Sequence, residues 1–235
     1  MLSIALFCEG ASEVKILTHI ITRYLGDDVS VNPIQPEMVT NHGYERQGTY
    51  GGWQGVLNHC NDDAIKRALS TNDYLVIQID TDRCHEDHYD VNRYDENHVE
   101  VTDEELYGRI VMRLFQDVSE DVRCEYGQRI LFAICFNETE CWLLPIFYES
   151  SSPKECAATN NCIFRLNKKL SKDGFGIPDK EKNIPAAIKV YQKILKDLKR
   201  KDIPRISQYN YGFKMFVEQM DSIKEQMGLS VKSES

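Results

Sequence analysis

Acidic side chains follow three apolar stretches of the sequence, each of which has the length of a β-strand. Together with a glutamate shortly after the first of them, they are Glu9, Glu13, Asp80, Asp82, Glu138 and Glu140. Carboxylates held side by side repel one another, so a divalent cation is their natural partner, and Mg²⁺ or Mn²⁺ suits oxygen ligands. The sequence therefore predicts a metal site in which Asp80 and Asp82 hold the ion. Glu9 would complete the metal shell or act as a general acid or base.

The first carboxylate stands between an apolar run and a predicted helix. Ile4–Cys8 is the apolar run, and Gly10 permits a sharp turn after Glu9 because glycine has no Cβ. Ser12 is a candidate N-cap, and apolar residues at helical spacing predict a helix that ends at Gly26. In open α/β sheets, ligands collect at such strand ends. A surface glutamate before an ordinary strand–helix turn is the alternative interpretation.

Strand and helix patterns alternate along residues 3–148. Nearly continuous apolar runs such as Leu75–Ile79 are typical of buried parallel strands, whereas two prolines restrict Val31–Val39 to an edge or irregular strand. The predicted fold class is α/β, a mostly parallel sheet with helices on both faces, followed by a helical C-terminal segment. Right-handed crossovers would bring the three acidic strand ends to one edge of the sheet.

Two motifs resemble the Toprim domain of topoisomerases, primases and OLD-type nucleases. They are the strand-ending Glu9-Gly10 and the strand-ending Asp80-Thr81-Asp82. Two later motifs resemble small bacterial Toprim proteins of the RloB-like kind, namely Glu140-Cys141-Trp142-Leu143-Leu144 and Asn210-Tyr211-Gly212-Phe213. The resemblance covers residues 3–145, with weaker similarity as far as residue 220.

The resemblance implies a nuclease that depends on Mg²⁺ or Mn²⁺ and cleaves phosphodiester bonds of DNA or RNA. Glu9, Asp80 and Asp82 would be its catalytic residues, and Glu13 and Glu140 would be candidate ligands of a second ion, with Glu138 beside them. The resemblance also implies a toxic effector of bacterial anti-phage defence that acts with an ABC-type ATPase. A catalytically inactive Toprim-fold adaptor that binds the ATPase is the main alternative. Nucleotidyl transfer, as in primases, is a third reading, and homo-oligomer assembly is left open.

The length and composition are those of a globular protein, with 235 residues of which 42% are hydrophobic. A chain of this length can bury a core in one domain, or in one domain with an appendage. We expect a Toprim-like catalytic domain in residues 1–150 and a basic helical segment in residues 151–228. Residues 229–235 are expected to form a disordered tail.

The cysteine pattern and the first residues predict a cytoplasmic protein. Eight cysteines are present, none in a Cys-x-x-Cys pair, so no disulfide framework is expected and a reducing compartment is favoured. Cys141 lies in an apolar element, where cysteine usually acts as a small hydrophobic residue. No basic leader precedes the first strand. The most apolar stretch, Ile130–Tyr148, contains polar and acidic residues, so we expect no membrane span.

Charge is divided unevenly along the chain. Residues 1–164 contain 12 Lys and Arg against 28 Asp and Glu, whereas residues 165–205 contain 13 against 5. Within the second range, a helix over 184–200 with Asn183 as its cap would present one basic face, made of Lys189, Lys193, Lys196 and Arg200. Such a face is either an ordinary solvated surface or a track for nucleic-acid phosphates. These four residues are our predicted nucleic-acid contacts.

Residues 84–105 form an unusually acidic stretch that also contains Cys84, His85, His88 and His98. The spacing of these cysteine and histidine residues matches no standard zinc site, although zinc binding is conceivable. A solvated loop that covers the metal site is the favoured interpretation.

Overall fold

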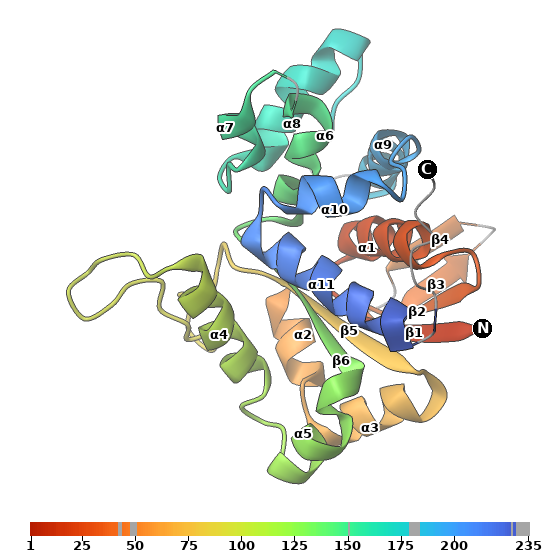
Figure 1. Cartoon of the computed structure of the whole chain (residues 1–235), viewed down its shortest axis with the longest axis vertical. Helices are drawn as coiled ribbons and strands as arrows, with labels where there is room; N and C mark the ends of the chain where they lie inside the picture. The colour runs from red at the N-terminus through yellow and green to blue at the C-terminus, as the bar shows by residue number, and fades with distance from the viewer. Residues whose placement is uncertain (42–43, 48–50, 150, 179–183, 227, 229–235) are drawn as a thin grey trace.

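A four-stranded sheet lies at the centre of the computed structural model (Figure 1). Its strands, in spatial order, are β2 (Val29–Gln35), β1 (Leu2–Phe7), β5 (Tyr74–Asp80) and β6 (Ile130–Cys135). A separate antiparallel hairpin consists of β3 (Met38–Asn41) and β4 (Tyr44–Gln47). The structure describes residues 1–41, 44–47, 51–149, 151–178, 184–226 and 228.

All three pairings within the central sheet are parallel, so the predicted α/β class is confirmed. The proline-containing Val31–Val39 stretch contributes to β2, which is an edge strand as expected. Successive side chains of each central strand point to opposite faces of the sheet. Ala5 and Phe7 of β1 therefore lie in one core cluster, whereas Ile4 and Leu6 lie in the other.

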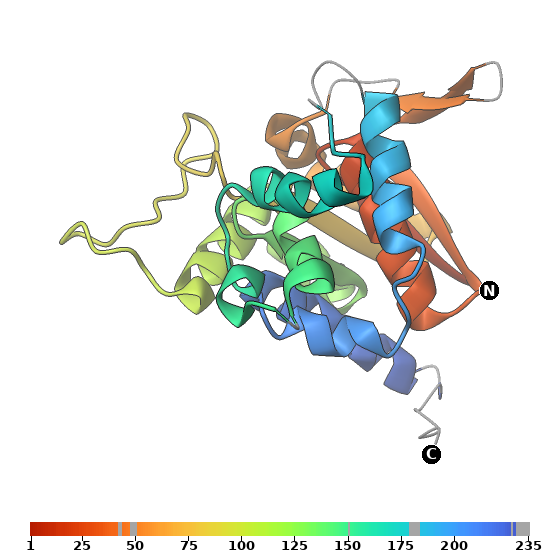
Figure 2. The ribbon, with the colours of Figure 1, turned by 90° about the horizontal axis from the view of Figure 1, so that it is seen from above.

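Helices cover both faces of the sheet (Figures 1 and 2). One core cluster lies beneath α2 (Trp53–His59), α3 (Asp62–Thr71), α4 (Asp103–Leu114) and α5 (Glu120–Tyr126). The other lies beneath α1 (Ala11–Leu25), α6 (Leu144–Tyr148), α8 (Cys162–Leu170), α9 (Ile184–Leu195), α10 (Asp202–Ser207) and α11 (Tyr211–Gln226). Short helical turns complete the chain, namely α7 (Pro153–Cys156), η1 (Gly127–Arg129), η2 (Thr139–Leu143) and η3 (Ser171–Asp173).

Helix α1 begins two residues after Glu9, the first candidate carboxylate. Gly10 is its N-cap, and Ser12 is buried inside the first turn, so the prediction that Ser12 caps the helix is wrong. Because the helix starts at Ala11, before the position that a Ser12 cap would give it, the turn after Glu9 is shorter than predicted. The helix ends at Gly26 as predicted, where φ is 119°, a value that favours glycine.

Helix α9 is shorter than the sequence pattern predicted. It ends at Leu195, and the chain then turns through Lys196 toward Arg200. The prediction of one basic helical face over 184–200 is therefore wrong. The apolar spacing that suggested a longer helix includes Leu198, which is buried although it lies beyond the end of the helix. The predicted cap Asn183 and the tail 229–235 lie outside the described residues.

Helix α11 lies along β6 and is held there by close contacts (Figure 1). The side-chain amide of Gln219 donates to the carbonyl of Phe132 (3.1 Å) and its Oε1 accepts from the Phe132 N–H (2.8 Å). Gly212 lies so near the strand that a Cβ there would stand 1.9 Å from the carbonyl oxygen of Ile134. Because α11 belongs to the same core cluster as β1, the C-terminal helices and the sheet share a core.

The segment between β5 and α4, residues 81–102, extends away from the sheet in both views (Figures 1 and 2). It contains an isolated antiparallel bridge between Tyr94 and Glu100. Within the described ranges, none of the helices has the length and apolar character that crossing a bilayer would require.

Replacing Gly212 with Ala should lower the free energy of unfolding by about 1–3 kcal/mol, because the added methyl group overpacks the contact with Ile134. The matched control is Gly108→Ala in α4, where a Cβ meets nothing within 4 Å. That change should stabilise the protein by up to ~1 kcal/mol through helix propensity. Chemical denaturation measures both. A Gly212→Ala protein as stable as the control variant would contradict the close approach of α11 to β6.

Candidate functional site

Glu9 joins the ends of β1 and β5. Its Oε1 accepts a hydrogen bond from the backbone N–H of Asp80 (2.6 Å). Its own N–H donates to Oε1 of Gln78 (3.0 Å), and its carbonyl accepts from the N–H of Gly52 (2.6 Å). The first candidate carboxylate is thus fixed against the strand that carries the second, as expected from parallel strand order.

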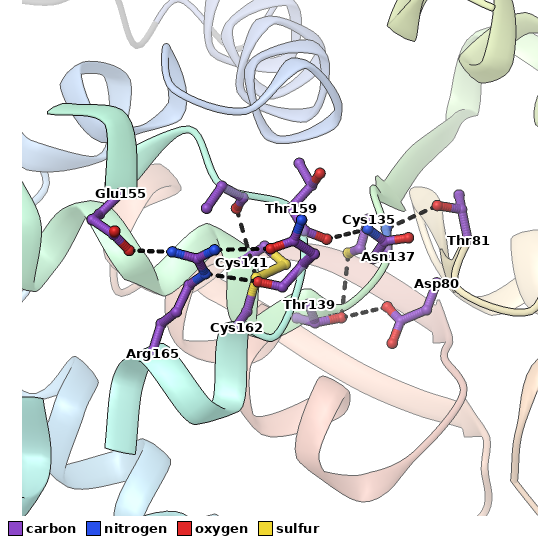
Figure 3. The surroundings of a disulfide bond; sticks show 12 residues. Asp80, Thr81, Cys135, Asn137, Thr139, Cys141, Glu155, Thr159, Cys162 and Arg165 are labelled. Atoms are coloured by element: carbon purple, nitrogen blue, oxygen red, sulfur yellow. Dashed lines mark hydrogen bonds and ion pairs between the residues drawn. A yellow bond between two sulfur atoms is a disulfide. The ribbon is translucent and has the colours of Figure 1, made fainter. Parts of the chain in front are cut away.

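Asp80 is oriented by two donors from the protein interior. Its Oδ1 accepts from Nε2 of Gln78 and from Oγ1 of Thr139, both at 2.8 Å. Gln78 and Thr139 are fully buried and are also joined to each other (3.2 Å). Figure 3 shows Thr139 beside Asp80 and near the sulfur of Cys135. The carboxylate of Asp80 therefore has one oxygen held in place by the core of the sheet.

The chain after β5 is locked to the chain after β6. The N–H groups of Thr81 and Asp82 both donate to the carbonyl of Asn137 at 3.2 Å, and the Asn137 N–H donates to Oγ1 of Thr81 (2.9 Å). Asn137 has a φ of 62°, in the left-handed region. Asp82 is exposed while its backbone is held.

Several of the predicted ligands act electrostatically on two buried groups, Cys8 and Tyr89. Burial raises the pKa of the Cys8 thiol well above its ordinary value, and the negative charges of Glu13, Glu9 and Asp80 raise it further. Burial also raises the pKa of the Tyr89 hydroxyl, with added contributions from Glu9, Asp80 and Asp82. Tyr89 donates to the carbonyl of Asp80 (3.0 Å). Glu9 and Asp80 thus act on both buried groups, whereas Glu13 acts on Cys8 and Asp82 acts on Tyr89.

The two acidic residues that follow β6, Glu138 and Glu140, lie in different surroundings. Glu140 is fully buried, and the hydroxyl of Tyr191 in α9 donates to its Oε1. Glu138 is half-buried at the start of η2. The structure thus ties Glu140 to α9, beneath the strand edge, and Glu138 lies nearer the surface.

The donor chemistry of the site fits Mg²⁺ or Mn²⁺, because the gathered side chains are hard carboxylate oxygens. Their present arrangement is not a ligand shell: in the part of the chain that the structure describes, no group of three or more His, Cys, Asp or Glu side chains is placed to hold a metal ion. Glu9 instead directs Oε1 to the Asp80 N–H. Among the residues considered as zinc ligands, Cys84 is buried in the core, whereas His85 and His88 are exposed.

Two residues that organise the site were not among the sequence candidates. Gln78 lies within an apolar strand pattern, and a glutamine between Ile77 and Ile79 is the sequence signal of a buried polar function. Thr139 stands between two acidic residues, and nothing in the sequence around it distinguishes it. Its role depends on the fold that brings it to Asp80.

A disulfide joins Cys141 of η2 to Cys162 of α8 (Figure 3). No disulfide framework was expected, but this one bond is present, and Cys141 is more than a small hydrophobic residue. The two cysteines are 21 residues apart and their Cα atoms lie at 5.1 Å. Their pairing depends on how α8 packs against η2, which no sequence spacing encodes. The amide of Asn137 also donates to the carbonyl of Thr159, so the segment before α8 is attached to the site loop.

The four predicted nucleic-acid contacts are exposed, but they do not share one helix. Lys189 and Lys193 are on α9, whereas Lys196 and Arg200 follow it. The ammonium group of Lys193 stands 3.5 Å from the ring centroid of Phe175. The basic residues therefore occupy a helix and the turn after it.

Comparison with protein-family models, with curated proteins and with solved structures finds no match to this chain.

Replacing Cys162 with Ser should lower the free energy of unfolding by about 3 kcal/mol, because the bond closes a loop of moderate length in the unfolded chain. Denaturation without reductant measures the loss. Wild type in dithiothreitol should fall to the stability of the variant, and the exposed free cysteine offers the control Cys124→Ser, which should leave stability unchanged. Equal wild-type stability with and without reductant would contradict a stabilising disulfide.

Proposed function

We propose that this protein is a nuclease that depends on Mg²⁺ or Mn²⁺ and cleaves phosphodiester bonds of DNA or RNA. The observation that carries the proposal is the direct contact between two strand ends, where Glu9 Oε1 accepts from the N–H of Asp80. With exposed Asp82 two residues further on, three carboxylates come to the edge of a parallel sheet where ligands collect.

In this proposal Asp80 and Asp82 hold the ion, and Glu9 completes the shell or transfers a proton. A bound Mg²⁺ or Mn²⁺ would polarise the scissile phosphate and lower the pKa of an attacking water. Gln78 and Thr139 orient Asp80 through its Oδ1. Glu9 would exchange its contact with the Asp80 N–H for the ion.

The biological role that accompanies this activity is proposed from the Toprim-like motifs alone. The protein would be a toxic effector of bacterial anti-phage defence, located in the cytoplasm and acting with an ABC-type ATPase. The Cys141–Cys162 disulfide opposes a reducing compartment, since cytosolic thiols are usually kept reduced. Measuring whether the disulfide forms in cells therefore bears on the proposed location.

A catalytically inactive adaptor is the second candidate function. The observation that favours it is the bond from the Asp80 N–H to Glu9, which gives this carboxylate a structural task without any ion. In an adaptor, the acidic strand edge would serve as a surface for a partner protein. Cleavage assays separate the two candidates.

Mutation of Asp80 should abolish cleavage, reduce the stabilisation by metal and leave the fold intact. Saturating Mn²⁺ should stabilise the wild type by about 2.7 kcal/mol at a hundredfold excess over its dissociation constant, and Asp80→Asn and Glu9→Gln should show a smaller gain. Without metal, Asp80→Asn should be as stable as wild type or slightly more so, because one repelling charge is removed. Melting curves with and without Mn²⁺ measure this.

Cleavage of a mixed DNA and RNA panel should fall in parallel, tested with the protein alone and with an ATPase encoded beside it. The control is Asp121→Asn, which removes an exposed carboxylate from α5. This control should keep both the Mn²⁺ stabilisation and the cleavage of the wild type. The nuclease proposal fails if neither metal affects the wild type and if Asp80→Asn and Glu9→Gln behave as the wild type does. The adaptor function would then remain.

Combined replacement of Lys189, Lys193 and Lys196 with Gln should weaken nucleic-acid binding and flatten its salt dependence. Each lost phosphate contact should lower the slope of log affinity against log salt by about 0.7–0.9. Fluorescence anisotropy across a salt series measures both quantities. Lys214→Gln is the control, because Lys214 is partnered by Glu218 on α11. Unchanged affinity and slope would make these lysines ordinary surface.

A further inference from the structure

A cavity of about 440 Å³ opens beside the candidate ligand Asp82. It is lined by Asp82, His85, Arg93, Tyr94 and Glu100. All five residues belong to the 81–102 segment that extends from the sheet (Figure 2). The volume falls within the range of about 300–1,000 Å³ that small-molecule sites occupy. Two of the five lining side chains are carboxylates, the proposed metal ligand Asp82 and Glu100, and the others are a cation, an imidazole and an aromatic ring.

Arg93 is held in a defined position at this cavity. Its NH1 donates to Oδ1 of Asn137 (2.5 Å), and its side chain is 18% exposed. Asn137 is the residue whose backbone is locked to Thr81 and Asp82, so the guanidinium is fixed relative to the proposed metal ligand. A guanidinium carries five N–H donors in a planar fork that matches phosphate oxygens.

The present partner of Arg93 at the cavity is weak enough to be exchanged. NH2 of Arg93 stands 3.6 Å from Oε1 of Glu100, whose side chain is 63% exposed. Because the Glu100 carboxylate is exposed to water and the contact is long, we expect this ion pair to contribute about 0–1 kcal/mol, whereas a phosphate can accept a bidentate contact. A phosphate group could therefore take the place of Glu100.

Tyr94 supplies an aromatic surface next to this cation. It is 48% exposed, follows Arg93 in the chain, and is set by the bridge to Glu100. Aromatic side chains of this kind stack on nucleobases, and a base can present its face only where it is not paired within a duplex stack. Arginine and tyrosine side by side thus match a phosphate and the base attached to it.

We propose that this cavity binds one unpaired nucleotide of the substrate, with its phosphate on Arg93 and its base on Tyr94. The inference rests on the proposed nuclease function and deepens it, because it identifies the substrate class as single-stranded nucleic acid or an unpaired end. His85, exposed at the same cavity, offers a further hydrogen-bonding group to the base or sugar. The bound strand is thereby placed beside Asp82.

Binding of a short fluorescein-labelled oligothymidylate, measured by anisotropy in EDTA so that no cleavage occurs, tests the proposal. Tyr94→Ala should weaken binding about tenfold, and Tyr94→Phe should retain wild-type affinity because stacking remains. Arg93→Gln should weaken binding and lower the salt slope by about 0.7. Val99→Ala is the matched control, since Val99 is an exposed apolar residue of the same segment outside the cavity lining. It should bind as the wild type does.

A blunt duplex in the same assay should bind more weakly than the single strand and should respond little to Tyr94→Ala. Melting curves show whether each variant remains folded. If Arg93→Gln does not remain folded, the comparison of Tyr94→Ala with Tyr94→Phe still decides the test. Wild-type affinity in both Tyr94→Ala and Arg93→Gln would overturn the subsite even if the protein cleaves nucleic acid. Weakened binding in these variants would support it even if no metal-dependent cleavage were found.

Discussion

The hydrogen bond from the backbone N–H of Asp80 to the carboxylate of Glu9 is the contact on which the arrangement of the strand edge depends. It joins the end of β1 to the end of β5 where ladder pairing has stopped, since the last paired residues there are Phe7 and Ile77. A charge-assisted bond of this kind is stronger than a neutral one. It fixes the Glu9 carboxylate, just before α1, against the backbone of Asp80. A ligand that binds the Glu9 carboxylate must therefore compensate for the loss of this hydrogen bond.

Strand and helix placement followed from patterns that depend only on local sequence. The apolar runs predict β1, β5 and β6, and Glu9 and Asp80 meet because parallel strands present like ends at one edge. Glu140, after β6, is instead bound by Tyr191. The remainder depended on contacts between distant residues. The partner of Cys141, the hydrogen bond from Thr139 and the end of α9 at Leu195 each arise from tertiary packing, which periodicity along the chain does not contain.

The C-terminal helices and the acidic edge are physically connected, which gives the basic residues of α9 a relation to the site. Tyr191 of that helix donates to Glu140, and Asn137 of the site loop donates to Thr159 before α8. A change in the position of α8 or α9 would therefore be felt at η2, where Thr139 orients Asp80. The disulfide adds a covalent link to the same short element.

The pairing of Gln219 with Phe132 has a consequence for assembly. The side-chain amide satisfies both the N–H and the C=O that β6 would otherwise offer to a strand from another molecule. At the opposite margin, β2 carries Pro33, which has no N–H to donate. Both margins of the sheet are thus protected against strand addition at these positions. At these positions, two copies of this chain, or a partner protein, would meet through helices and loops instead of through a continuous intermolecular sheet.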